Sequence, residues 1–194
     1  KERQSNMRLA GLEFEPMETV FPAVTCTVQA SFRTARYADE HGMVANGFYS
    51  REFHKAYFWE QSSDLIKGKR IWADFRQNGG TVGQMFWQQS LGQDSDVLLS
   101  PAPIHKHGGG MIQDCFSRPS GLYEYLCGRI GSRFNLINYW GPFASHKSSR
   151  WITRATAEVM ASEWAPDLLL SYLPHLDYAL QKSGPGSAAS EKAF

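Results

Sequence analysis

Asp167-Leu168-Leu169-Leu170-Ser171-Tyr172-Leu173 is a nearly continuous apolar run with the length of one β-strand. Apolar residues at successive positions, rather than at alternate ones, predict a strand that is buried on both faces, as in a parallel sheet covered by helices. Pro174-His175-Leu176-Asp177 follows the run directly. Because ligands of such sheets bind beyond the carboxyl ends of the strands, we expect Asp177 to lie where a metal or phosphate ligand is needed.

The rest of the chain alternates predicted helices with short apolar strands. Helices are predicted over residues 25–35, 70–78, 122–130 and 149–164. Strands are predicted over residues 81–87 and 96–99, and a strand or hairpin over residues 47–59. Gly79-Gly80 and Gly131 are placed to end two of the helices. This alternation predicts an α/β fold with a parallel sheet covered on both sides.

The composition indicates one folded unit with no large charged surface. The chain has 194 residues, of which 42% are hydrophobic, so it can bury a core. Its 20 Lys and Arg against 19 Asp and Glu argue against a nucleic acid polymer or an anionic membrane surface as partner. No apolar stretch approaches the roughly 20 residues that span a bilayer. With no repeat or linker, residues 1–194 are expected to form a single domain, and no pattern indicates its oligomeric state.

The cysteines and the chain ends carry two further expectations. Cys26, Cys115 and Cys127 are an odd number without metal-finger spacing, which argues against a disulfide framework and favours a reducing, cytoplasmic compartment. The chain opens at Lys1 without a methionine and ends, over residues 187–194, in what looks like the beginning of a helix. We therefore expect an internal piece of a longer protein.

Thr25 stands at the predicted start of the helix over residues 25–35. A hydroxyl in that place is close to unpaired backbone N–H groups and to the positive end of the helix dipole. Those groups stabilise an attacking alkoxide and the charge of a phosphoryl transition state. The alternative is that Thr25 serves only as the N-cap of the helix, since threonine is a favoured cap residue.

Two sequence motifs support a catalytic role for Thr25. Pro22-Ala23-Val24-Thr25, followed by His41-Gly42 and Asn46, resembles the nucleotide pyrophosphatase/phosphodiesterase branch of the alkaline phosphatase superfamily. In that family Pro-x-x-Thr opens a helix, and His-Gly-x-x-x-Asn follows at the same spacing. A second match runs from Asp177 to Gly184-Pro185, where the family carries Asp-x-x-x-His-x-x-Gly-Pro. The resemblance implies an alkaline-phosphatase-like three-layer sandwich with a mostly parallel central sheet, here incomplete at both ends.

The resemblance also implies roles for individual residues. Thr25 would be the nucleophile that takes the phosphoryl group and contacts one metal ion, and Asp177 would be a carboxylate ligand of the other. Asn46 would donate to a phosphate oxygen, whereas His41-Gly42 would shape a turn. Two divalent ions, zinc by resemblance, would favour the Thr25 alkoxide and neutralise the phosphate. Manganese or magnesium also suit an oxygen-rich set of ligands.

The chain departs from the family pattern at the metal ligands. Gln181 stands where the family has a histidine, and a neutral amide oxygen is a poorer zinc ligand than an imidazole. His175 is a possible substitute, because residues two apart in extended backbone point to the same face as Asp177. The loop His105-Lys106-His107 is another possible source of a substitute ligand. For each of these histidines, the alternative is a structural role in which the side chain is exposed or hydrogen-bonded. The family's early metal-binding aspartate and its late Asp-His and His ligands have no match in this chain. The chain is therefore expected to hold about half of a site for two metal ions.

The function expected is metal-dependent hydrolysis of a small phosphodiester or pyrophosphate through a threonine nucleophile. The alternatives are a phosphonate, monoester or sulfate hydrolase of the same fold, or a binding domain that has lost its metal site. The 194 residues alone, a single α/β catalytic-domain fragment, are expected to be nearly inactive. A substrate-side cap is expected within about residues 47–140. Trp140-Gly141-Pro142 could stack on a base, sugar or aryl group, with core packing as the alternative for the tryptophan.

Overall fold

A four-stranded sheet forms the centre of the fold. The computed structural model describes residues 8–9, 12–13 and 17–193. The sheet has the order β10-β5-β6-β9, with β5 at Val82–Met85, β6 at Val97–Pro101, β9 at Cys115–Arg118 and β10 at Leu168–Ser171. β10 and β6 both pair in parallel with β5, whereas β9 pairs antiparallel with β6. This confirms the α/β fold with a mostly parallel sheet.

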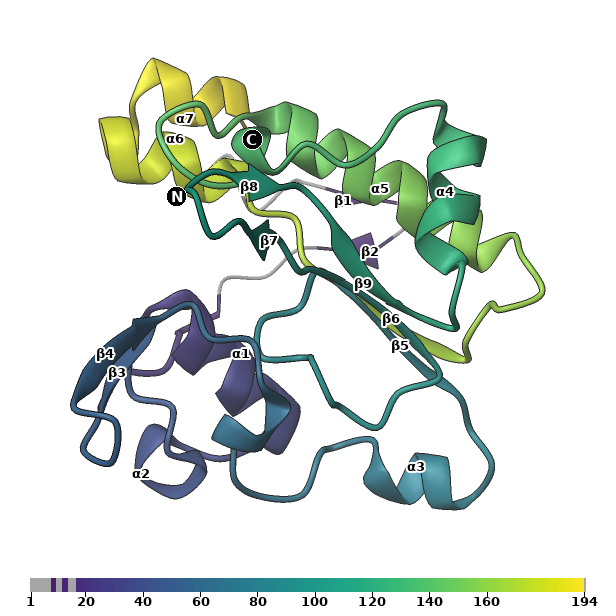
Figure 1. Cartoon of the computed structure of the whole chain (residues 1–194). Helices are drawn as coiled ribbons and strands as arrows, with labels where there is room; N and C mark the ends of the chain where they lie inside the picture. Colours follow the sequence, from purple (N-terminus) through teal and green to yellow (C-terminus); the bar gives the residue numbers. More distant parts are fainter. Residues whose placement is uncertain (1–7, 10–11, 14–16, 194) are drawn as a thin grey trace.

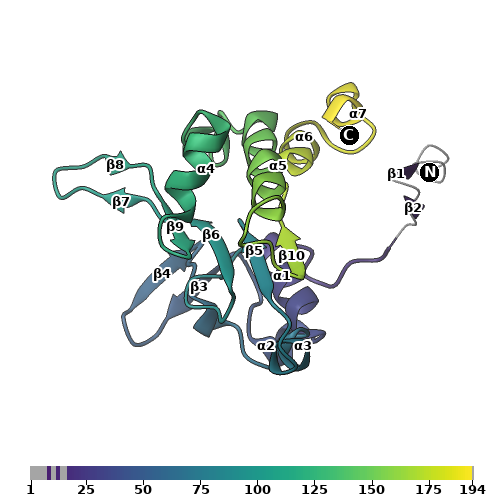
Figure 2. The same cartoon turned by 90° about the vertical axis from the view of Figure 1, so that its right-hand side faces the viewer.

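Helices lie on both sides of this sheet and make three layers. α4 (Leu122–Ile130) and α5 (His146–Met160) cover one face. α1 (Thr25–Thr34), with the short helices α2 (Ala38–His41) and α3 (Ala73–Gln77), lies on the opposite side (Figures 1 and 2). α6 (His175–Ser183) and α7 (Ala188–Ala193) follow β10 and lie beside the first turns of α5.

The remaining elements are short. β1 (Arg8–Leu9) pairs with β2 (Leu12–Glu13), and the 3-10 helices η2 and η3 span Ser63–Leu65 and Leu136–Asn138. Two antiparallel hairpins, β3–β4 (Gly47–Ser50 and Lys55–Phe58) and β7–β8 (Ile104–His105 and Met111–Ile112), lie off the central sheet. Both hairpins fall within residues 47–140, where the cap is predicted, but so do β5 and β6 of the sheet. β7–β8 extends away from the body of the molecule (Figure 2).

The main core lies between the sheet and the helices α4 and α5. Leu122 and Leu126 of α4 and Ile152, Ala155 and Val159 of α5 are fully buried and pack against residues of β5 and β6. Their spacing of three, four or seven residues places them on one side of each helix. Each fully buried leucine or isoleucine side chain contributes about 1.5–3 kcal/mol. None of the helices among the described residues is long and apolar enough to cross a bilayer.

Three sequence-based expectations differ from the structure. β10 was expected to be buried on both faces, but all four of its residues are only half-buried, because it forms one edge of the described sheet. α3 begins at Ala73 rather than at residue 70, because residues 70–73 form a turn in which the Ala73 N–H donates to the Arg70 carbonyl and the Ile71 N–H donates to the Arg33 carbonyl instead. α5 spans residues 146–160, earlier than the predicted 149–164.

The chain ends are only partly described. Lys1 and Phe194, on which the expectation of cut ends partly rests, lie outside the described residues. The expected closing helix is α7, and its described part runs from Ala188 to Ala193. All three cysteines are free, which agrees with the absence of a disulfide framework.

Candidate active site

A cavity of about 530 Å³ opens where β5 and β10 end and α1 begins. This is the edge at which open parallel sheets bind their ligands. Its lining combines aromatic walls with a few polar groups: Thr25, Trp59, Gln88, Tyr139, Trp140, Gly141, Ala144, Tyr172, Pro174, Asp177, Tyr178 and Gln181. Thr25 and Asp177, which lie in distant parts of the sequence, therefore share one cavity.

Thr25 is the first residue of α1 rather than its cap. The N-cap is Val24, in extended conformation and without a side-chain capping bond, so the expectation that Thr25 acts only as an N-cap is wrong. The Thr25 side chain instead lines the cavity beside the phenol of Tyr172. Burial raises the pKa of Tyr172 to about 12, and the neighbouring Thr25 side chain lowers it in part. The phenol therefore keeps its proton at neutral pH beside the threonine.

Asn46 supplies the missing cap of α1 from outside the helix. Its Oδ1 accepts a hydrogen bond of 2.9 Å from the backbone N–H of Cys26, which satisfies one of the unpaired donors of the first turn. Because Oδ1 is the acceptor, the amide nitrogen remains free to donate elsewhere. The structure thus brings Asn46 to the first turn of α1, where it bonds to Cys26, the residue that follows Thr25. Its role as a donor to a phosphate oxygen stays a prediction.

Asp177 lies in the first turn of α6 and lines the cavity together with Gln181. The two residues are four apart on the helix, and Gln181 Nε2 donates to Asp177 Oδ2 at 2.7 Å. The amide that replaces the family histidine therefore turns its nitrogen, not its oxygen, toward the carboxylate. A nitrogen that carries two hydrogens cannot bind a cation, so this amide would have to rotate before it could serve as a ligand.

The histidines considered as substitutes lie elsewhere. His175 was expected to share a face with Asp177, which is wrong because the helix begins at His175 and residues two apart in a helix point about 200° from each other. His175 Nε2 instead bonds to the carbonyl oxygen of Ala193 at 2.8 Å. His105 and His107 belong to the exposed β7–β8 hairpin and do not line the cavity.

Comparison with known proteins identifies the family. The model of the family described as type I phosphodiesterase/nucleotide pyrophosphatase matches residues 5–194. The chain belongs to this family. No curated protein sequence matches the chain.

Solved structures of low sequence identity share the fold of this type I phosphodiesterase chain. Phosphonoacetate hydrolase from Sinorhizobium meliloti 1021, in complex with phosphonoformate, is 17% identical with a TM-score of 0.56, over 90% of this chain and 40% of its own. Murine ectonucleotide pyrophosphatase/phosphodiesterase 5 is 16% identical with a TM-score of 0.50, over 90% and 39%. The chain thus spans about two fifths of the length of these structures. The likeness confirms the alkaline-phosphatase-like fold.

The cavity of this type I phosphodiesterase chain offers few oxygen donors to a metal ion. Its oxygen donors are the Thr25 hydroxyl, the Asp177 carboxylate and, after rotation, the Gln181 amide. Zinc sites take about four ligands and magnesium sites about six. Among the residues that the structure describes, no group of three or more His, Cys, Asp and Glu could hold a metal ion. Thr25 and Asp177 alone are too few ligands for such a site, and their roles as metal ligands stay predictions.

Gln88, Tyr139 and Tyr172 are among the cavity residues that were not singled out from the sequence. Gln88 Nε2 donates to the Tyr139 hydroxyl at 3.0 Å, and Gln88 Oε1 accepts from Gln61 Nε2 at 2.7 Å. Burial raises the pKa of Tyr139 well above its ordinary value, so this phenol also stays protonated. Gln88 follows the carboxyl end of the strand predicted over residues 81–87, and the rule that singled out Asp177 could have found it. Tyr172 follows the observed β10 but lies inside the strand predicted from the sequence.

Cys26 and His41 have structural roles beside this site. The Cys26 thiol is buried and accepts a hydrogen bond from Gln89 Nε2 at 3.0 Å, and burial raises its pKa, so it is a poor nucleophile. His41 is fully buried; its Nδ1 accepts from the Met43 backbone N–H, and its Nε2 bonds to the Ser31 hydroxyl at 3.0 Å. His41-Gly42 therefore shapes the turn, as predicted.

Proposed function

We propose that the protein containing this chain is a metal-dependent phosphoric ester hydrolase that cleaves small phosphodiesters or pyrophosphates through Thr25. One observation carries the proposal: Thr25, at the start of α1, and Asp177, at the start of α6, line the same cavity. The family membership supports a hydrolase of the phosphodiesterase and pyrophosphatase kind. The names of the structural neighbours, a phosphonoacetate hydrolase and a nucleotide pyrophosphatase/phosphodiesterase, support chemistry at phosphorus.

In the proposed reaction the Thr25 oxygen attacks the phosphorus atom and the ester oxygen leaves. Backbone N–H groups at the start of α1 stabilise the negative charge that builds on the phosphoryl oxygens. Asn46, held in place by the Cys26 N–H, donates to one of these oxygens. Water then attacks the phosphothreonine, which releases the phosphate product and restores the hydroxyl. Each displacement inverts the configuration at phosphorus.

Two divalent ions are part of the proposal, with Asp177 and Thr25 among their ligands. When bound, such ions neutralise the phosphate and favour the threonine alkoxide. Zinc follows from the family resemblance, whereas an oxygen-rich set that includes the Gln181 amide suits manganese or magnesium. The aromatic side chains of Trp59, Trp140 and Tyr139 leave room for a base or aryl group beside the phosphate.

The test uses the full-length protein and bis(p-nitrophenyl) phosphate. We expect hydrolysis only with added divalent metal. Thr25→Val, which replaces the hydroxyl by a methyl group of equal size, should reduce kcat by at least 1,000-fold, on the order of the effect expected for an essential nucleophile. Thr27→Val is the matched control, since the buried Thr27 hydroxyl has no hydrogen-bond partner among the described residues. Equal activity of both variants would remove Thr25 from the mechanism.

The bond between Gln181 and Asp177 favours a second candidate, a binding domain that has lost its metal site. An amide N–H that occupies the carboxylate competes with a cation for the same lone pairs. In that case the full-length protein would bind a phosphate ester without turnover at any metal concentration. Gln181→His would then leave it inactive, whereas in the hydrolase it should increase zinc affinity.

A further inference from the structure

A chain of hydrogen bonds between buried side chains ends at Tyr139, in the wall of the candidate active site. Gln61 Nε2 donates to Gln88 Oε1 at 2.7 Å, and Gln88 Nε2 donates to the Tyr139 hydroxyl at 3.0 Å. All three residues are buried, and Gln88 and Tyr139 line the cavity together with Thr25. Gln61, Gln88 and Tyr139 are called the relay below.

Backbone groups decide the direction in which the relay donates. Gln61 Nε2 also donates to the Trp59 carbonyl at 2.8 Å, and Gln61 Oε1 accepts from the Gln89 backbone N–H at 3.2 Å. A carbonyl only accepts and a backbone N–H only donates, so the Gln61 amide cannot be turned over. Its nitrogen therefore faces Gln88 Oε1, which leaves Gln88 Nε2 to face Tyr139.

Contacts with α1 hold the middle residue of the relay. Gln29 Oε1 accepts from the Gln88 backbone N–H at 2.8 Å, and the fully buried Arg33 guanidinium donates to the Gln88 carbonyl. Arg33 also donates to the Gln89 carbonyl at 2.7 Å. Because α1 begins at Thr25, these bonds fix Gln88 relative to the helix that carries the candidate nucleophile.

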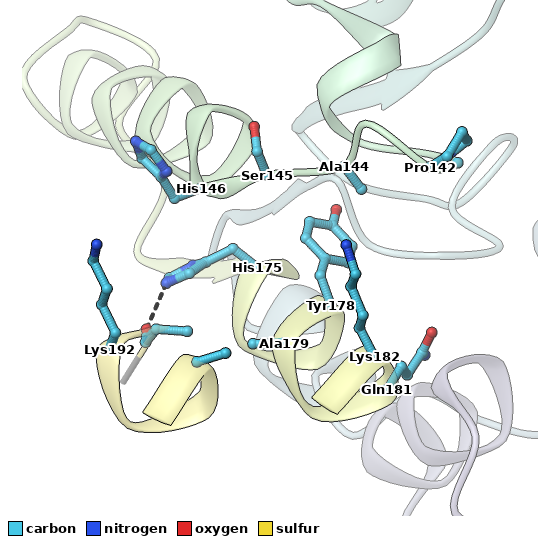
Figure 3. A pocket seen from close by; sticks show the side chains of 13 residues that line it. Pro142, Ala144, Ser145, His146, His175, Tyr178, Ala179, Gln181, Lys182 and Lys192 are labelled. Atoms are coloured by element: carbon cyan, nitrogen blue, oxygen red, sulfur yellow. Dashed lines mark hydrogen bonds between the residues drawn. The ribbon is translucent and has the colours of Figure 1, made fainter. Parts of the chain in front are cut away.

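Tyr139 is held from the side of a second cavity. This cavity, of about 670 Å³, lies between the start of α5 and the helices α6 and α7, and Lys182 and Lys192 are in its lining (Figure 3). Tyr178 lines both cavities, and its hydroxyl donates to the Tyr139 carbonyl at 2.7 Å. Of the two cavities, Gln88 and Tyr139 line only the one that holds Thr25, so the relay serves that site.

The relay leaves two polar hydrogens without an acceptor. The Tyr139 oxygen accepts from Gln88, so the phenol hydrogen is left to donate, and no described residue accepts it. Gln88 Nε2 carries a second hydrogen, which also has no acceptor among the described residues. Burial raises the pKa of Tyr139 well above its ordinary value, so the phenol keeps its hydrogen. Buried donors without partners are unfavourable, and the relay therefore favours a ligand with an acceptor oxygen.

These donors belong to the aromatic part of the cavity lining. The Tyr139 and Trp140 rings are 5.5 Å apart, and the Gln61 amide that orients the relay also bonds to the Trp59 carbonyl. Both tryptophans line the cavity. In the proposed function, backbone N–H groups of α1 and Asn46 stabilise the phosphoryl oxygens, and the aromatic side chains leave room for the organic group. The relay is therefore placed to bond to that organic group.

We propose that Tyr139 determines substrate specificity: its hydroxyl, oriented by Gln61 and Gln88, donates to an acceptor oxygen on the organic group of the phosphodiester. The inference rests on the proposed function and narrows its substrates to esters whose aromatic group carries a carbonyl or a similar acceptor. Gln88 donates its remaining hydrogen to the same group. Gln61 is a positioning residue, because it acts through Gln88.

The first experiment measures kcat/KM of the full-length protein for bis(4-acetylphenyl) phosphate and bis(4-ethylphenyl) phosphate, with the released phenol separated by chromatography. The two diesters have similar size, and only the first has a carbonyl. The acetyl-to-ethyl ratio of kcat/KM should fall on the order of tenfold in Tyr139→Phe, as expected for one lost hydrogen bond. Damage to packing alone would lower both values equally, and an unchanged ratio would overturn the proposal.

Tyr123→Phe is the matched control for this substitution. Tyr123 is buried to a similar degree, its hydroxyl accepts from the Phe134 backbone N–H at 3.2 Å, and it does not line the cavity. The acetyl-to-ethyl ratio should be the same in Tyr123→Phe as in the unmodified protein. An equal fall of the ratio in both phenylalanine variants would also overturn the proposal.

Gln88→Glu tests the direction of the relay. A carboxylate has no N–H, so it accepts from Gln61 and from the Tyr139 hydroxyl and turns the phenol hydrogen away from the ligand. The ratio should fall as far as in Tyr139→Phe, and combining the two substitutions should lower it no further. Gln93→Glu is the control, since Gln93 is buried, accepts from Arg70 at 2.7 Å and does not line the cavity. Losses that multiply in the double variant would overturn the relay.

A binding measurement separates this proposal from the proposed function. Absence of any hydrolysis of either diester would refute the proposed function. Calorimetry of both diesters with the full-length Thr25→Val protein does not depend on turnover. Adding Tyr139→Phe should lower the acetyl-to-ethyl ratio of affinities on the order of tenfold. An unchanged ratio, or no binding of the acetyl compound, would overturn the role of Tyr139.

Discussion

Replacing Asn46 by alanine tests how α1 is held at the candidate active site. The substitution removes the Oδ1 atom that accepts from the Cys26 N–H at 2.9 Å and leaves that donor without its partner beside a fully buried side chain. Loss of a side-chain cap costs about 1 kcal/mol, and an unpaired buried donor costs about 1–3 kcal/mol. We therefore expect the free energy of unfolding to fall by about 1–2 kcal/mol. In a domain of this size the melting temperature would fall by roughly 2–8 °C.

Asn46→Asp is the matched control for this prediction. Aspartate keeps an oxygen acceptor in the same place and adds a negative charge at the helix N-terminus, which contributes about 0.3–1 kcal/mol. Urea denaturation of the chain, followed by tryptophan fluorescence, should therefore show alanine destabilised and aspartate as stable as the unmodified chain. Because aspartate lacks the amide N–H, the full-length Asp variant should still lose hydrolytic activity. A destabilisation by aspartate as large as that by alanine would refute the capping role of Asn46.

Three further predictions concern stability. Gly83→Ala should destabilise the fold by about 1–3 kcal/mol, because the new Cβ would lie 2.6 Å from a side-chain carbon of β10. Gly128→Ala should stabilise α4 by about 0.5–1 kcal/mol, because the new Cβ would have no atom within 4 Å. Urea denaturation checks both predictions. Burial lowers the pKa of His41, so the unfolded chain binds more protons near the ordinary pKa of about 6.5. The free energy of unfolding should therefore decrease as the pH falls from 7.5 to 5.5, and His41→Gln should make this decrease smaller. An equal dependence of the free energy of unfolding on pH in the variant and the unmodified chain would contradict this prediction.

Much of the fold could be predicted because local sequence patterns determine where its helices and strands form. The spacing of apolar residues in residues 122–130 predicted α4 with its observed bounds, and Gly131 ends that helix in the left-handed conformation. The aromatic segment over residues 47–59 is the β3–β4 hairpin. Burial of β10 was predicted wrongly, since an apolar strand at the edge of a sheet has the same local pattern as one at its centre.

The candidate site was predictable only in part. Motif order and strand ends pointed to Thr25 and Asp177, and the structure places both in one cavity. The bond between Gln181 and Asp177 required knowing that α6 already begins at His175, because four residues bring two side chains together only on a helix. Tyr172 and Thr25 line the same cavity although no local signal connects the two segments that carry them.

The amino-acid sequence by itself determined the helices, most strands, the family and the residues that begin α1, because caps, glycines and apolar spacing act within a few positions along the chain. The tertiary structure alone decided that β10 lies at an edge, that Asn46 caps α1 and that Lys182 and Lys192 surround a space beside the candidate site. These features depend on contacts between distant segments. The stabilising contacts form only when the sheet assembles, so no short stretch of sequence predicts them.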